Sequence, residues 1–131
     1  MKQLSIKSPA ASRLRQRKYA LVRRFSIPAD LVGGSFVATH RRCGRTNCHC
    51  ASGVGHAQWT LTTSFHGRRR VERIPRDWVA DLEHAVAKTQ AYLDAVKELM
   101  AINVELLSLA RFERQVRQKE RRGRAKKMLE K

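Results

Sequence analysis

The sequence predicts an α+β protein in which a small antiparallel sheet of about three strands carries a cysteine-rich loop between two helices. Three observations predict this class. Two helical patterns flank a central stretch of short alternating segments, all three cysteines fall between two of those segments, and the 131 residues carry a formal net charge of +17. A chain of this length forms one small domain with appended segments.

Charge and pattern divide the chain into four segments. They are a basic N-terminal helix and linker (1–30), a β-sheet region (31–76), a long helix (77–120) and a basic tail (121–131). Residues 1–24 hold eight basic side chains and no acidic one, whereas residues 77–110 hold six acidic and two basic ones. The long helix is therefore an acidic element inside a cationic protein.

The first helix is expected over residues 9–25. Pro9 suits the first turn of a helix, and Gly33 and Gly34 lie in the break that follows. Its apolar residues, which approximate one face, are Leu14, Leu21, Val22 and Phe25. The opposite surface is basic and consists of Arg13, Arg15, Arg17, Lys18, Arg23 and Arg24.

Three short strands follow, in "SFVATHRR" (35–42), "AQWTLTTSF" (57–65) and "RRRVERIP" (68–75). The second strand alternates well: Trp59, Leu61, Thr63 and Phe65 share one side, and Gln58, Thr60, Thr62 and Ser64 share the other. His66 and Gly67 form the turn to the third strand. The register of this hairpin stays open, because Val71 and Ile74 have opposite parity.

The segment from residue 77 to about 120 contains no glycine or proline and predicts one long helix. Its apolar positions alternate in spacing between three and four, which is the pattern of a heptad seam. The seam consists of Val79, Leu82, Val86, Thr89, Leu93, Val96, Met100, Asn103, Leu107 and Ala110. Either this helix packs in a monomeric bundle, or it pairs with a second copy or with another protein.

The loop between the first two strands contains every cysteine. Cys43, Cys48, Cys50 and His56 give the spacing C-x4-C-x-C-x5-H. Three thiolates and one imidazole suit tetrahedral zinc, so we expect a structural Zn²⁺ knuckle on the sheet. Gly44, Asn47 and Gly53 would allow its tight turns. The alternatives are cysteines without a metal and a redox-active thiol cluster, and His49, His40 and His66 are the other candidates for the fourth ligand.

Catalysis is not expected. A hydrolytic zinc needs an open coordination position and a nearby general base, and no Asp or Glu occurs between Leu31 and Val71. The acidic residues of the long helix follow its charge pattern. We therefore expect a non-enzymatic protein.

The excess of positive charge favours a nucleic-acid partner. Candidate phosphate contacts are the basic residues of the first helix, Arg41, Arg42 and Arg45 beside the cysteines, Arg68, Arg69 and Arg70 after the turn, and Arg121, Arg122, Arg124, Lys126 and Lys127 in the tail. No segment is apolar enough to span a membrane. Unpaired thiols favour a reducing compartment, and the acid-free N-terminus also fits a transit peptide.

The run "GGSFVATHRRCGRTNCHCASGVGHAQWTLTTSFHGRRRVERIP", followed by a long helix, resembles a small bacterial family of unknown function often encoded near transposases and other mobile-element genes. The matching residues are Gly34, Ser35, Arg41, Arg42, Cys43, Gly44, Cys48, Cys50, Gly53 and His56. Ala57 and Gln58 replace the usual Gly and Pro. The resemblance covers about residues 31–110.

The resemblance implies a bacterial, cytoplasmic setting, nucleoid-associated if DNA is bound, and argues against a transit peptide. It favours DNA over RNA and a role accessory or regulatory to a mobile element. The alternatives are an interaction subunit of a larger nucleoprotein assembly, such as a transposase complex, and an RNA- or ribosome-binding protein. In either case a homo-oligomer or a protein partner is expected through the long helix.

Overall fold

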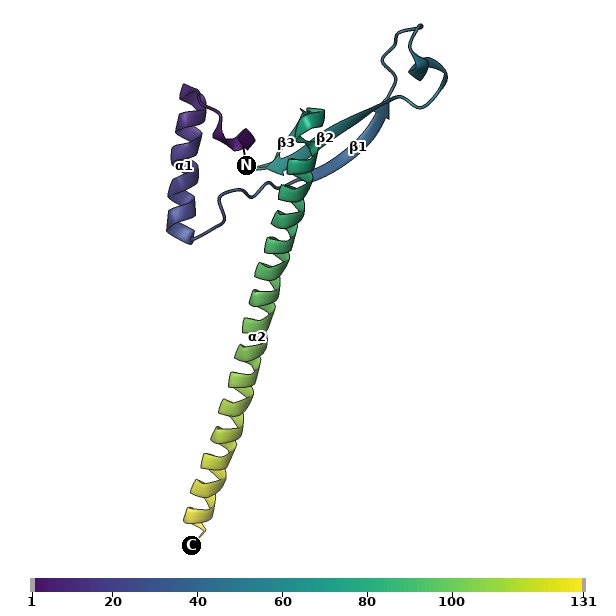
Figure 1. Cartoon of the computed structure of the whole chain (residues 1–131). Coiled ribbons are helices and arrows are strands. Elements are labelled where there is room, and N and C mark those ends of the chain that lie inside the picture. Colours follow the sequence, from purple (N-terminus) through teal and green to yellow (C-terminus); the bar gives the residue numbers. More distant parts are fainter. Residues whose placement is uncertain (1, 131) are drawn as a thin grey trace. The chain divides into compact units, whose positions relative to one another are not determined.

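The computed structural model describes residues 2–130, so Met1 and Lys131, the outermost residues of the predicted first and last segments, lie outside the described residues. The element order is η1 (Lys2–Ser5), α1 (Pro9–Phe25), β1 (Ser35–Arg41), η2 (His49–Ser52), β2 (His56–Phe65), β3 (Arg68–Ile74), η3 (Arg76–Trp78) and α2 (Val79–Leu129) (Figure 1). This order confirms the predicted α+β class. The chain forms two compact units, one ending at Ala91 and one starting at Tyr92.

Local capping sets the bounds of α1. The Ser8 side chain accepts a hydrogen bond from the Ala11 backbone N–H at 3.1 Å, and Pro9 occupies the first turn. The helix stops where Ser26 adopts a left-handed conformation with φ of 53°. No residue of α1 is buried, so its apolar and basic side chains both reach solvent to some degree.

The three strands form one antiparallel sheet in the order β1-β2-β3. Trp59 lies opposite Ile74, and Thr62 lies opposite Val71. This register shows which apolar residue of β3 shares the apolar face of β2. Ile74 lies on the face of Trp59 and Leu61, whereas Val71 lies on the side of Thr60 and Thr62. The ring of Phe36 stacks on that of Trp59 with centroids 5.0 Å apart, and Leu61 is buried on the same face.

The turn between β2 and β3 is the one that the sequence predicts. His66 and Gly67 both have positive φ, of 54° and 76°. Two consecutive left-handed residues are characteristic of a two-residue turn whose twist matches that of the flanking strands. The turn therefore fixes the β2–β3 register.

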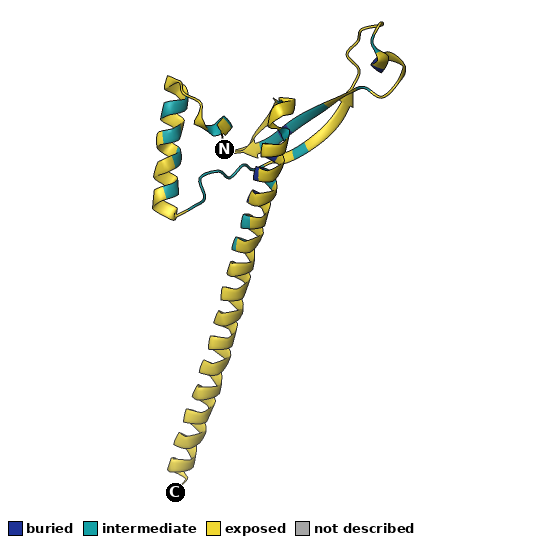
Figure 2. Cartoon of the chain, in the orientation of Figure 1, coloured by how far each residue is buried: buried dark blue, intermediate teal, exposed yellow. Residues whose placement is uncertain are grey.

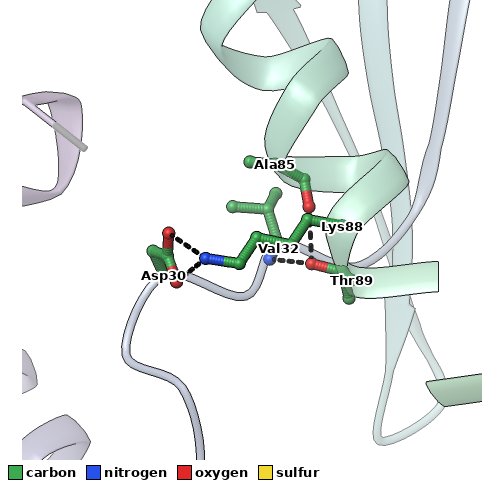
Figure 3. A network of polar contacts seen from close by, with 5 residues as sticks. All are labelled: Asp30, Val32, Ala85, Lys88 and Thr89. Atoms are coloured by element: carbon green, nitrogen blue, oxygen red, sulfur yellow. Dashed lines mark hydrogen bonds and ion pairs between the residues drawn. The ribbon is translucent and has the colours of Figure 1, made fainter. Parts of the chain in front are cut away.

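The core of the unit ending at Ala91 is small. Its buried apolar residues are Cys50, Leu61, Leu82 and Ala85, and Thr89 is buried with them. The Val32 N–H donates to Thr89 Oγ1 at 2.8 Å, and the same hydroxyl donates to the Ala85 carbonyl at 2.7 Å (Figure 3). These bonds fasten the segment before β1 to the first turns of α2.

Two further features position the linker, that is, the segment between α1 and β1. Lys88 Nζ lies 3.2 Å from the Asp30 carboxylate, which lowers the pKa of Asp30. Gly34 has a φ of +125°, and a Cβ there would lie 2.6 Å from the Thr62 carbonyl oxygen. The entry into β1 therefore requires glycine for both conformation and space.

Helix α2 contains 51 residues, which corresponds to about 75 Å at the usual rise per residue. The prediction that it ends near residue 120 was wrong, because it continues through Gly123 to Leu129. Arg, Lys, Ala, Met and Leu after residue 120 are good helix formers, and a single glycine costs only about 1 kcal/mol. None of the helices within residues 2–130 has a stretch apolar enough for its length to cross a membrane.

The heptad seam of α2 is covered only near its start. Leu82 and Thr89 are buried, and Val79, Val86 and Val96 are half-buried. The remaining seam residues, Leu93, Met100, Asn103, Leu107 and Ala110, are exposed. Every residue from Lys97 to Glu130 is exposed, which Figure 2 shows as the uninterrupted yellow part of the helix.

Candidate metal centre

The cysteine loop begins and ends at one point of the sheet. Arg41, the last residue of β1, pairs with His56, the first residue of β2, so residues 42–55 form a closed loop at the tip of these strands (Figure 1). Gly55 lies against the chain on the other side of this closure. A Cβ at Gly55 would lie 2.3 Å from the carbonyl carbon of Arg41 and 2.6 Å from the Arg42 nitrogen. Sequence reasoning missed this glycine, because its need for space comes from Arg41 on the paired strand.

Short turns fold the loop back on itself. Gly44 has a φ of +81°, which confirms the expectation that it makes a tight turn after Cys43. The Cys48 N–H donates to the Arg45 carbonyl at 3.4 Å, and the Ala51 N–H donates to the Cys48 carbonyl at 3.1 Å. Gly53 is different from the expectation, because its φ of −143° is accessible to any residue.

The structure brings the four predicted ligands together. The Sγ atoms of Cys43 and Cys50 are 3.4 Å apart, and Cys48 Sγ is 3.2 Å from His56 Nε2. All four ligand atoms of Cys43, Cys48, Cys50 and His56 lie within 4.8 Å of one another. In a zinc tetrahedron with Zn–S bonds near 2.3 Å, neighbouring ligand atoms are separated by about 3.8 Å. The cluster therefore has the size of a Cys3His metal site.

The thiols of the cluster differ in their electrostatic surroundings. The backbone amide of Arg45, together with Cys50 and His56, lowers the pKa of Cys43 to about 6. The amide of Cys43, 3.5 Å from Cys50 Sγ, acts to lower the pKa of Cys50, but burial and the neighbouring sulfurs raise it overall. A thiolate at Cys43 is a ready metal ligand. All three cysteines are free of disulfides.

The other histidine candidates lie outside this group. The ring of His49 meets that of His56 edge to face, with centroids 5.3 Å apart, and its Nδ1 is 3.9 Å from Cys48 Sγ. His40 pairs with Ala57 in the sheet, and His66 is in the β2–β3 turn. His56 is the histidine that joins the three sulfurs.

Arginines surround the loop and one face of the sheet. Arg41, Arg42 and Arg45 are exposed beside the cluster. We define the hydroxyl face as the side of the sheet formed by Gln58, Thr60, Thr62 and Ser64 of β2 with Arg69, Val71 and Arg73 of β3. Arg69 lies opposite Ser64 on this face, and Arg73 lies opposite Thr60.

The three arginines predicted as one group are divided between the two faces. Arg68 and Arg70 lie on the side of Trp59 and Leu61, because neighbouring residues of a strand point in opposite directions. Arg70 Nε is 3.5 Å from the Glu72 carboxylate. Sequence reasoning missed Arg73, which strand alternation would have identified once the register was fixed.

The remaining predicted basic residues lie on the two helices. In α1, Arg15 donates to the Ile6 carbonyl and Arg23 to the Tyr19 carbonyl, whereas Lys18 and Arg24 lie over the rings of Tyr19 and Phe25. In α2, the five basic residues between Arg121 and Lys127 are exposed. They belong to the unit starting at Tyr92, whereas the loop and β3 belong to the unit ending at Ala91.

Comparison with known proteins gives one result. The model of a domain of unknown function, DUF6788, matches residues 11–84. The match includes most of α1, the whole sheet and the cysteine loop, and it ends in the second turn of α2. It therefore begins and ends earlier than the expected range of 31–110. No curated protein matches the chain, and no solved structure does.

Proposed function

The chain belongs to the DUF6788 family, whose function is unknown, and we propose that it is a non-enzymatic nucleic-acid-binding protein stabilised by a structural zinc ion. The observation that carries the proposal is the convergence of Cys43, Cys48, Cys50 and His56 within 4.8 Å, directly after two exposed arginines.

The donor set supports zinc. Three sulfurs and one imidazole nitrogen are borderline-soft ligands, which is the combination found in structural zinc sites. Four protein ligands complete a tetrahedron, so they leave no coordination position for a catalytic water. The ion would then act on folding, where structural zinc contributes on the order of 10 kcal/mol in small finger peptides.

Because the core is small, the folding free energy that a bound zinc ion would supply is important for the stability of the loop. Cys50 is 1% exposed and lies within the loop, whereas the other buried apolar residues belong to β2 and α2. The loop thus has no buried apolar residue besides a ligand to hold its shape, and its Val54 is exposed. A metal ion that joins four points of a loop replaces the missing hydrophobic contacts.

The charge distribution supports a polyanion as the partner. Arg41, Arg42 and Arg45 are presented by the closed loop, and Arg69 and Arg73 lie among the hydroxyls of β2. Arginine, serine and threonine are common donors to phosphate oxygens. DNA is the favoured nucleic acid because the resembling family is encoded near mobile elements, and an accessory or regulatory role in such an element follows from the same setting.

The metal half of the proposal is tested by metal analysis of protein purified with nuclease treatment. We expect one zinc per chain, and we expect His56→Asn to lower the zinc content and the affinity for zinc. The matched control is His49→Asn, which changes the neighbouring ring outside the cluster. A chain that keeps its fold without bound metal, or equal losses in the two variants, would refute the zinc site.

The nucleic-acid half is tested with duplex DNA and RNA across a salt series. If six or more phosphates are contacted, affinity for DNA should fall about a thousandfold between low and physiological salt. Arg69→Gln with Arg73→Gln should weaken binding more than Arg68→Gln with Arg70→Gln, which removes the same charge from the opposite face of the same strand. Binding that is insensitive to salt would contradict the proposal, and stronger binding to RNA would contradict the choice of DNA.

A further inference from the structure

The second half of α2 carries an apolar face that no other described residue covers. Within residues 99–110, the seam residues Met100 and Leu107 are 56% and 65% exposed. A second row with the same alternating spacing runs beside the seam and consists of Leu99, Ile102, Leu106 and Leu109, which are 46–61% exposed. We call these two rows the apolar face. A contiguous exposed face of large aliphatic side chains marks an interaction site in a water-soluble helix.

The charges along α2 and the residues just before it are arranged around this face. Residues 99–110 hold a single charged side chain, that of Glu105. Residues 77–98 hold five acidic and two basic side chains, whereas residues 111–131 hold ten basic and three acidic ones. The apolar face therefore has a negative segment on its N-terminal side and a positive segment on its C-terminal side.

The charges at the seam positions indicate whether a partner helix lies parallel or antiparallel to α2. After Ala110 the same alternating spacing places arginine at residues 114, 117, 121 and 124. In a parallel pair, equivalent residues lie at the same level, so each of these arginines would face its own copy. In an antiparallel pair that superimposes residues 99–110, residues 111–124 lie opposite residues 85–98 instead. Within these ranges, residues 92–98 hold two acidic side chains and one lysine, and they lie opposite residues 111–117, which hold three arginines and one glutamate. The antiparallel arrangement thus keeps the apolar contact and replaces like-charge repulsion by attraction next to the apolar face.

We infer that the apolar face is occupied by a second copy of this chain, with the two α2 helices antiparallel and residues 99–110 of both copies side by side. The charges of α2 are complementary to those of a second α2 that runs antiparallel to it. This complementarity identifies a second copy as the occupant, because an unrelated partner would not need to carry matching charges. This inference goes beyond the proposed function and depends neither on zinc nor on nucleic acid.

Chemical cross-linking of lysines distinguishes the arrangements. Lys88 and Lys119 are about 46 Å apart along one continuous helix, beyond the reach of a short-spacer reagent. In the antiparallel pair, Lys88 of one copy lies at the level of Lys119 of the other. We expect nuclease-treated full-length protein to have at least twice the 15.0 kDa mass of the chain and to yield a Lys88–Lys119 link. A monomeric mass, or Lys88–Lys88 links in place of Lys88–Lys119 links, would overturn the inference.

Substitution tests whether the apolar face makes the contact. Leu106→Gln with Leu107→Gln leaves the net charge unchanged and should return the mass to that of one chain and abolish the Lys88–Lys119 link. Both leucines are exposed in the single chain, at 57% and 65%, so its fold does not depend on them. The matched control, Ser108→Gln, alters the outer side of the same turn and should leave mass and cross-link unchanged. Retention of the link in the double variant would contradict the inference.

Discussion

Gly55 lies so close to Arg41 that a Cβ on the glycine would be 2.3 Å from the arginine's carbonyl carbon. This approach occurs one residue before His56, which pairs with Arg41 at the end of β1. The two residues thus close the loop that brings three sulfurs and one imidazole together. The contact that closes the loop therefore also positions His56 beside the three cysteines of the candidate metal centre.

Gly55→Ala should open this closure. The added methyl group meets backbone rather than a movable side chain, so the strand ends must separate, and His56 moves with them. We expect zinc affinity to fall at least tenfold, measured by competition with a chromogenic chelator. Gly53→Ala is the control, because its Cβ would have only the His49 carbonyl oxygen nearby, at 3.8 Å, and its φ is not left-handed. Equal affinities in the two variants would show that the close approach is unimportant.

The hydroxyl of Thr89 should contribute more to the free energy of unfolding than the neighbouring ion pair between Lys88 and Asp30. Thr89→Val removes the acceptor of the part-buried Val32 N–H, and an unsatisfied buried donor costs about 1–3 kcal/mol. Urea denaturation should therefore show a lower free energy of unfolding for this variant. Lys88→Gln breaks the exposed contact with Asp30 in the same linker and should have a far smaller effect, because exposed ion pairs contribute little. Similar losses in both variants would contradict this assignment.

Zinc affinity should depend on pH through the cysteines. Because the pKa of Cys43 is lowered to about 6 and that of Cys50 is raised, at neutral pH Cys43 is largely thiolate and Cys50 still holds its proton. Binding must displace that proton, so affinity should rise by at least tenfold per pH unit from about pH 7 to 8. It should fall more steeply below about pH 6, where Cys43 also becomes protonated. A pH-independent affinity in chelator competition would contradict thiolate ligation.

Local patterns were sufficient to predict most of the fold. The alternation around Leu61, the turn at His66 and Gly67 and the spacing of the cysteines each depend on neighbouring residues, and the structure confirms all three. The choice of His56 over His49 could also be made locally, since a ring between two ligating cysteines lacks room to turn inward. These features need no knowledge of the rest of the chain.

Features that depend on pairing between distant segments could not be predicted. Strand alternation alone separates Arg69 from Arg70. Placing Arg69 and Arg73 on the hydroxyl face required the β2–β3 register, which two apolar residues of opposite parity left undecided. The burial of Thr89 in an apolar seam could not be foreseen, because its partner, Val32, is far away in the sequence and contributes only a backbone N–H. Gly55 was missed for the same reason, since its need for space comes from Arg41.

Helix α2 provides a last prediction, because it passes through Gly123 without any packing contact. A Cβ at Gly123 would meet no atom within 4 Å, so Gly123→Ala adds no clash and should stabilise the helix by about 1 kcal/mol. Helical circular dichroism should increase, and the thermal transition of the helix should shift upward. Gly67→Ala is the opposite case, because its Cβ also meets no atom but its φ is +76°, and the strained turn should lower stability. A loss of stability in Gly123→Ala would contradict a helix that continues through Gly123.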